Sequence, residues 1–98
     1  MQQVLNFITK LPKKKQVRIK SSTGIIANNR WVMYEGRVGI VTELEEDNAL
    51  FNAVGEDGIT YASLQVNPYL LNLATLKQIP EIRKPSEEIA VELGYMLK

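Results

Sequence analysis

The pattern of apolar and polar positions is most distinctive in residues 30–41, which read as strand, tight turn, strand. Residues 31–34 (Trp-Val-Met-Tyr) form an apolar run with high β-propensity, and the run after the turn is again apolar and β-branched. Gly36 lies between the two runs and can adopt the positive φ that a tight hairpin needs. Gly39 lies inside the second run, where a glycine indicates a bulge or a close backbone approach. The pattern predicts a strongly bent antiparallel sheet.

Other short strands are predicted on both sides of this hairpin. Residues 17–20 alternate between apolar and basic side chains, which is the signature of a half-buried strand. Arg18 and Lys20 would lie on the solvent face of that strand. The remaining β-branched or apolar runs that predict short strands are residues 25–27, 59–61 and 71–73.

The segment after the hairpin predicts a strand whose buried face is ambiguous. Residues 49–54 are mostly apolar, but Leu50 and Phe51 have opposite parity, so a bulge would have to decide which face is buried. Residues 55–58 contain an Asp-Gly pair, which predicts a hairpin turn. Residues 62–68 are interpreted as a connection associated with a 3₁₀ turn.

Helices are predicted at both ends of the chain. Residues 1–12 place their apolar side chains on one helical face, which predicts a short amphipathic helix, with a lead-in strand as the alternative. Ser86 is a suitable N-cap for a second helix over residues 86–97. Gly94 inside that helix costs about 1 kcal/mol relative to alanine, so we expect the helix to fray near its end. The expected apolar stripe of the second helix consists of Ile89, Leu93, Met96 and Leu97.

About five short strands with tight turns predict a mainly β fold, namely a small SH3-like barrel of about five antiparallel strands, closed or nearly closed, with a short helix at each terminus. Closure would protect the edge strands that a sheet of this size otherwise exposes. We expect one domain over residues 1–98, with the barrel spanning residues 16–79. The residues expected to be largely buried are Val17, Ile19, Val32, Tyr34, Val41, Ile59 and Leu73.

Residues 31–41 resemble the first hairpin of SH3-like barrels, and in particular the KOW motif. In that motif an apolar strand and a glycine turn are followed by Gly-x-Val entering the next strand, and the resemblance covers about residues 29–54. KOW-type barrels occur in transcription-elongation factors and ribosomal proteins, so the resemblance implies contact with nucleic acid or protein. The size of the chain and residues 73–85 are also similar to small bacterial and prophage proteins.

Composition argues against catalysis and against a membrane protein. The 98 residues include no cysteine and no histidine, which excludes disulfides, thiolate metal sites, the usual zinc sites and histidine-dependent triads. Neither glycine-rich phosphate-binding pattern is present. We therefore expect no enzymatic activity, no cofactor and no metal. No apolar run approaches the length of a membrane span, and the amino terminus lacks the pattern of a signal peptide, so we expect a cytoplasmic protein.

The charges are segregated along the chain although the net charge is only +1. Residues 1–40 carry eight basic residues and one acidic residue, a balance of +7, whereas residues 41–98 carry four basic and ten acidic residues, a balance of −6. Such asymmetry indicates a charged partner, unless folding interleaves the two halves. The candidate phosphate-contacting residues are Lys13, Lys14, Lys15, Arg18, Lys20, Arg30 and Arg37.

Two functions remain open at this point. The first is a non-catalytic module that binds nucleic acid through its basic amino-terminal segment and hairpin, where Trp31, Tyr34 and Tyr61 would stack on bases if they were exposed. The second is a protein-protein adaptor or an assembly component of a phage or mobile element. In that case the apolar terminal helices would form a partner or homodimer surface rather than cap the barrel.

Overall fold

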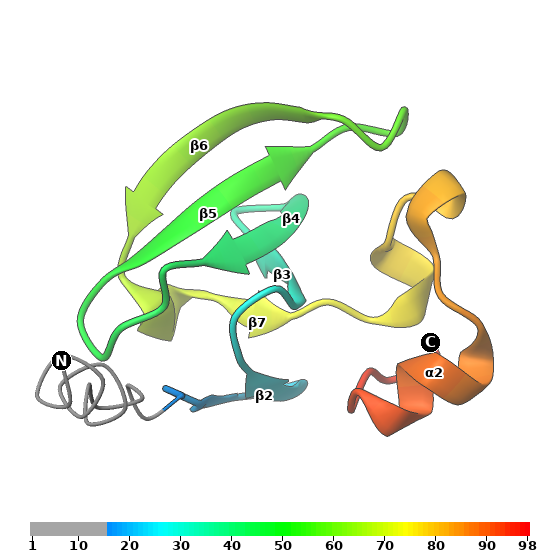
Figure 1. Cartoon of the computed structure of the whole chain (residues 1–98), viewed down its shortest axis with the longest axis horizontal. Coiled ribbons are helices and arrows are strands. Elements are labelled where there is room, and N and C mark those ends of the chain that lie inside the picture. The colour runs from blue at the N-terminus through cyan, green and yellow to red at the C-terminus, as the bar shows by residue number, and fades with distance from the viewer. Residues whose placement is uncertain (1–15) are drawn as a thin grey trace, which may run out of the picture.

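The computed structural model describes residues 16–98 and shows a mainly β protein with one short carboxy-terminal helix (Figure 1). The mainly β character and the antiparallel sheet confirm that part of the prediction. The predicted helix or lead-in strand of residues 1–12 lies outside the described residues. In chain order the elements are β1 (Ile19–Ser21), β2 (Gly24–Ile26), β3 (Trp31–Tyr34), β4 (Arg37–Thr42), β5 (Ala49–Val54), β6 (Thr60–Val66), η1 (Pro68–Leu70), β7 (Asn72–Leu73), η2 (Leu76–Gln78), η3 (Glu81–Arg83) and α2 (Glu87–Glu92).

The strands form a five-stranded antiparallel sheet in the order β6-β5-β4-β3-β7, beside a separate two-stranded sheet of β1 and β2. The predicted hairpin is confirmed: β3 and β4 pair with Tyr34 opposite Arg37, which leaves a two-residue turn. Glu35 and Gly36 in this turn have φ of 50° and 78°. Positive φ at both central residues is the type I′ geometry that matches the twist of a hairpin.

The prediction of a closed barrel is wrong, because the five-stranded sheet does not close on itself and β1 with β2 forms a second sheet. The β1–β2 hairpin instead contacts the strand β7 through side chains. Ser22 Oγ donates a hydrogen bond to Asn72 Oδ1 at 2.8 Å, and the Leu73 N–H donates to Ser21 Oγ at 3.1 Å. Side-chain hydrogen bonds therefore take the place of the continuous backbone ladder that closure would require.

Two local features predicted for the sheet, a close backbone approach at Gly39 and a bulge, are both present in the structure. A Cβ added to Gly39 would overlap the Asn52 carbonyl and lie 2.8 Å from the Phe51 ring, so Gly39 marks a close backbone approach. A bulge is present, but it lies in the neighbouring strand β6: Ala53 pairs with Ala62 and Val54 with Thr60, which leaves Tyr61 as the extra residue. In β5 itself, Phe51 and Val54 are both buried although they have opposite parity.

The core forms largely where it was expected. Ile19, Val32, Val41 and Leu73 are buried, and Val17 and Tyr34 are half-buried against the core. Ile59 was expected to be buried, but it is 64% exposed because it belongs to the turn that precedes β6. Residues 62–68 were interpreted as a connection, but β6 continues through Ala62 to Val66 because this segment pairs with β5.

The carboxy-terminal helix is shorter than the predicted range of residues 86–97. Ser86 is the predicted N-cap and accepts a hydrogen bond from the Ile89 N–H at 3.3 Å. The helix ends at Glu92 because Gly94 has φ of 90°, and the Gly94 and Tyr95 N–H groups donate back to the Val91 and Ala90 carbonyls. This is a Schellman motif, so Gly94 terminates the helix instead of weakening its interior.

Candidate functional site

The chain after α2 is held against the sheet by a small number of specific contacts. Ala90 and Tyr95 are buried, and the Trp31 N–H at the start of β3 donates a hydrogen bond to the Tyr95 hydroxyl oxygen at 2.8 Å. The Leu76 N–H of η2 donates to the Met96 carbonyl at 2.7 Å. These contacts fix which side of the helix faces the rest of the molecule.

Burial raises the pKa of the Tyr95 hydroxyl above its usual value, because the ionised phenolate would lose its hydration. The hydrogen bond from the Trp31 N–H and the nearby positive charge of Arg30 oppose this shift. Tyr95 is therefore a protonated, hydrogen-bonded structural residue at neutral pH. The sequence reasoning did not identify it, because its partner Trp31 lies 64 residues away in the chain.

A second set of contacts joins the segment before α2 to the sheet. The Arg83 guanidinium of η3 lies 5.4 Å from the centre of the Trp31 ring, and it also donates a hydrogen bond to the Gly58 carbonyl at 2.8 Å. Trp31 is only 7% exposed. It contributes to the attachment of the carboxy-terminal segment and is not accessible for stacking on a base.

This attachment leaves most large apolar side chains of the carboxy-terminal segment in solvent. All four residues of the expected apolar stripe are exposed, and so is Val91, so the stripe does not cap the sheet. The reason is geometric: the small side chain of Ala90 occupies the inward position of the helix, and Tyr95 fills the space after the Gly94 turn. The exposed apolar residues of the segment are Ile89, Val91, Leu93, Met96 and Leu97.

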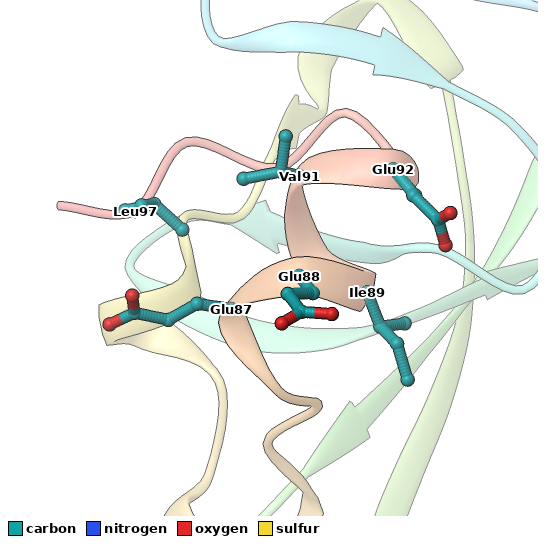
Figure 2. A pocket seen from close by; sticks show the side chains of 6 residues that line it. All are labelled: Glu87, Glu88, Ile89, Val91, Glu92 and Leu97. Atoms are coloured by element: carbon teal, nitrogen blue, oxygen red, sulfur yellow. The ribbon is translucent and has the colours of Figure 1, made fainter.

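An open hollow of about 480 Å³ lies over the outer side of α2 (Figure 2). Of the described residues, six line it, which we call the α2 patch: Glu87, Glu88, Ile89, Val91, Glu92 and Leu97. Figure 2 shows five of them projecting from α2 and Leu97 from the chain that follows, with the Glu87 and Glu92 carboxylates pointing in opposite directions. The patch thus mixes acidic and apolar side chains, and Figure 2 shows Glu88 between Val91 and Ile89 in its middle. The sequence reasoning assigned Glu87 and Glu88 only to the helix dipole and did not single out Val91.

The basic residues predicted to contact phosphate do not form a single cluster in the described part of the chain. Lys13, Lys14 and Lys15 lie outside the described residues. Arg18 and Lys20 are exposed on the same side of the β1 segment, as predicted. The other two predicted basic residues lie at opposite ends of β3: Arg30 precedes this strand, and Arg37 of β4 pairs with its last residue, Tyr34.

Arg30 precedes β3, is half-buried and lies near Tyr95, whereas Arg37 is exposed beside the turn at the far end. At about 3.3 Å per residue, four strand residues separate these ends by about 13 Å. Among the other candidate stacking residues, Tyr34 is half-buried with its ring 5.5 Å from that of Phe51, and Tyr61 is exposed.

The part of the chain that the structure describes was also searched for a metal site and for a membrane-spanning helix. Residues 16–98 contain no group of three or more acidic side chains placed to hold a metal ion. No helix in this part of the chain has the length and apolar character needed to span a bilayer. A scan against protein-family models gives no match, and searches of curated proteins and of solved structures find no significant similarity.

Proposed function

We propose that this protein is a non-catalytic protein-binding module and that the α2 patch is its docking surface. The observation that carries the proposal is that Tyr95 and Ala90 fix α2 while larger apolar side chains remain in solvent. Large apolar side chains that remain exposed together on one surface are typical of a protein interaction site. The lack of histidine and cysteine in the whole sequence supports the non-catalytic part of the proposal.

The composition of the patch selects the chemistry of the partner. Ile89, Val91 and Leu97 offer exposed apolar side chains, and Glu87, Glu88 and Glu92 lie among them and carry negative charge. A peptide segment that combines apolar side chains with lysine or arginine complements both features, because the basic side chains pair with the carboxylates while the apolar side chains are desolvated. An acidic or uncharged apolar segment would satisfy only one of them.

A pair of model peptides tests this proposal. An amphipathic Leu/Lys peptide and a Leu/Glu peptide of the same length and pattern are titrated against the full chain, with binding followed by calorimetry. We expect the Leu/Lys peptide to bind and the Leu/Glu peptide not to bind. The affinity of the Leu/Lys peptide should fall with salt, because salt screens the pairs between its lysines and the carboxylates of the patch. Replacing Ile89 and Val91 by Asn should abolish binding, whereas Ile82→Asn on the exposed η3 is the matched control. Equal binding of both peptides, or binding unaffected by the Ile89 and Val91 change, would exclude the α2 patch.

We also propose that the domain is an incompletely closed SH3-like barrel. The five-stranded antiparallel sheet is consistent with such a fold, as is the 3₁₀ turn η1 between β6 and β7. Because folds of this type host many unrelated binding roles, the fold does not select a partner.

Nucleic-acid binding remains a second candidate because of one specific observation: Arg18 and Lys20 are both exposed, directly after the lysine run at residues 13–15. Titration of labelled single- and double-stranded DNA and RNA at several salt concentrations tests it. We expect affinity on duplex DNA to fall with a slope near −0.9 per neutralised phosphate. Changing Lys13, Lys14 and Lys15 together to Gln should reduce the slope by up to about three. No binding at low salt would exclude this candidate.

Arg37 offers a separate test of the same candidate. A guanidinium beside a rigid turn can make directional contacts that lysine cannot, so Arg37→Ala should change the preference between nucleic acids rather than the overall salt slope. An unchanged preference among the four ligands would remove the hairpin from the proposed interface.

A further inference from the structure

The strand β6 is a long, uncharged edge strand with a bulge at Tyr61 near its start. It spans seven residues, and among the described strands it pairs only with β5, at the margin of the five-stranded sheet (Figure 1). Its sequence, Thr-Tyr-Ala-Ser-Leu-Gln-Val, contains no charged residue, no proline and no glycine. Natural edge strands are commonly blocked by charges, proline, bulges or short length, because their free backbone groups otherwise template pairing with another strand. The opposite edge, β7, has only two residues.

The side chains of β6 also leave apolar surface uncovered on both faces of the strand. Tyr61 is 60% exposed on one face. Leu64 lies opposite Phe51 and so points to the core side of the sheet, yet it is 43% exposed. Since the sheet does not close, no described strand continues the core beyond Leu64. A further strand beside β6 would satisfy its backbone groups and cover Leu64 in one step.

We propose that β6 pairs with β6 of a second copy of this chain, antiparallel about a twofold axis at Ser63. In this register Ser63 lies opposite itself and Ala62 opposite Leu64, and these residues form the regular centre of the pairing. Tyr61 would lie opposite Gln65 and Thr60 opposite Val66, which places the bulge at Tyr61 toward each end of the paired region. The strand is self-complementary because it carries no charge to oppose its own image, and Ala62 and Ser63 are small at its centre. The two five-stranded sheets then form one continuous ten-stranded sheet.

The dimer leaves the α2 patch free. Figure 1 shows β6 along the top of the molecule and α2 at the lower right, so the two surfaces belong to different parts of the fold. A dimer through β6 therefore presents two α2 patches and can bind a partner bivalently. The inference does not depend on the identity of that partner.

A charge-swap experiment tests this pairing. The Ser63 side chain is exposed, so Ser63→Lys and Ser63→Glu remove its hydrogen bond to Asn52 Oδ1 but leave the core side chains unchanged. In either variant alone, two like charges meet at the axis, and we expect the dimer dissociation constant to rise by about fivefold or more. Mixing the two variants in equal amounts should restore dimers, because opposite charges then face each other. Light scattering and analytical ultracentrifugation measure the mass, and circular dichroism confirms that each variant is folded.

A cysteine variant gives a second, independent readout. The chain has no cysteine, so Ser63→Cys introduces a single thiol. Residues that face each other across an antiparallel pair have Cα atoms about 4.5–5.5 Å apart, which is within the range of a disulfide. We expect Ser63→Cys to form a disulfide-linked dimer on mild oxidation and the exposed control Ile82→Cys to do so far more slowly.

Three results would overturn the proposal. The first is a parent protein that stays monomeric at its highest soluble concentration. The second is a dimer whose mass is unchanged in both charged variants, or whose mixture fails to restore it although each variant is folded. The third is a dimer that Val91→Lys disrupts and Ser63→Lys does not, which would place the interface on the α2 patch. Equal cross-linking rates at positions 63 and 82 would count against it in the same way.

Discussion

The central strands and the carboxy-terminal segment use apolar residues in opposite ways. In β3, β4 and β5 the inward-facing Val32, Val41 and Phe51 are completely buried. In the carboxy-terminal segment only Ala90 and Tyr95 are buried after the start of α2, and the larger apolar side chains are in solvent. The difference teaches that an apolar run is not by itself a core element: the sheet buries its apolar side chains, whereas α2 leaves most of its own exposed.

The physical cause of this difference is the way in which each region is held. A strand in a ladder is fixed by backbone hydrogen bonds along its whole length, so alternate side chains are driven into the core. The carboxy-terminal segment is fixed by the Tyr95–Trp31 hydrogen bond, the Met96–Leu76 backbone bond and one small buried residue, Ala90. Such point contacts set the orientation of α2 without covering its outer side.

The largest expected effect is at the centre of the sheet. Phe51→Ala removes a fully buried ring that also contacts Tyr34, so the free energy of unfolding should fall by about 3–5 kcal/mol. Ile89→Ala, in the exposed patch, should change it by less than about 0.5 kcal/mol. Urea denaturation of both variants measures the contrast. Comparable losses at the two positions would erase the distinction between the regions.

Tyr95→Phe should have an intermediate effect. The change keeps the ring but leaves the Trp31 N–H without its acceptor in a buried position, which costs about 1–3 kcal/mol of unfolding free energy. Tyr69→Phe, at an exposed tyrosine, is the control and should be neutral. A neutral Tyr95→Phe would mean that the hydrogen bond does not anchor the carboxy-terminal segment.

The same tyrosine predicts a pH dependence. Because burial raises the pKa of Tyr95 in the folded protein, the unfolded chain releases this proton first as the pH rises. The stabilising contribution is therefore fully present below the ordinary tyrosine pKa of about 10 and is lost as the pH rises through the folded value. Unfolding free energies measured across alkaline pH should decline more steeply for the parent than for Tyr95→Phe. Parallel curves would contradict the prediction.

A smaller loss of stability than at Phe51 is expected at the end of α2. Gly94 has φ of 90°, and a Cβ there would meet no atom within 4 Å, so Gly94→Ala tests backbone conformation alone. We expect a loss of about 1–2 kcal/mol, because an L-residue is strained in the left-handed region. Gly94→Asn should lose less, since asparagine is tolerated at this position of a Schellman motif. Thermal unfolding distinguishes the two, and an equal or larger loss for Asn would argue against the motif.

Local chemistry allowed part of the fold to be predicted. The Glu35-Gly36 turn, the turn at residues 55–58 and the Ser86 cap each depend on a few neighbouring residues, and all three are present in the structure. The features that were missed depend on distant partners. The second half of β6 has little β-propensity of its own and becomes a strand by pairing with β5, where Ser63 Oγ donates a hydrogen bond to Asn52 Oδ1 at 2.7 Å.

The candidate site was predicted less well than the fold for the same reason. The apolar character of α2 is visible in the sequence, but whether its side chains are covered depends on Tyr95 meeting Trp31 across the molecule. Closure of the sheet is likewise a long-range property, since it requires the first and last strands to meet edge to edge. The basic residues were recognised individually, but their separation along β3 follows only from the register of the sheet.

The most direct measurement combines stability and binding in one variant, Ile89→Asn with Val91→Asn. If the α2 patch serves binding and not folding, the free energy of unfolding should stay within about 0.5 kcal/mol of the parent. The affinity for the Leu/Lys peptide should meanwhile fall at least about tenfold, which corresponds to about 1.4 kcal/mol. A marked loss of stability together with an unchanged peptide affinity would show that these side chains belong to the core, and it would contradict the proposed role of α2.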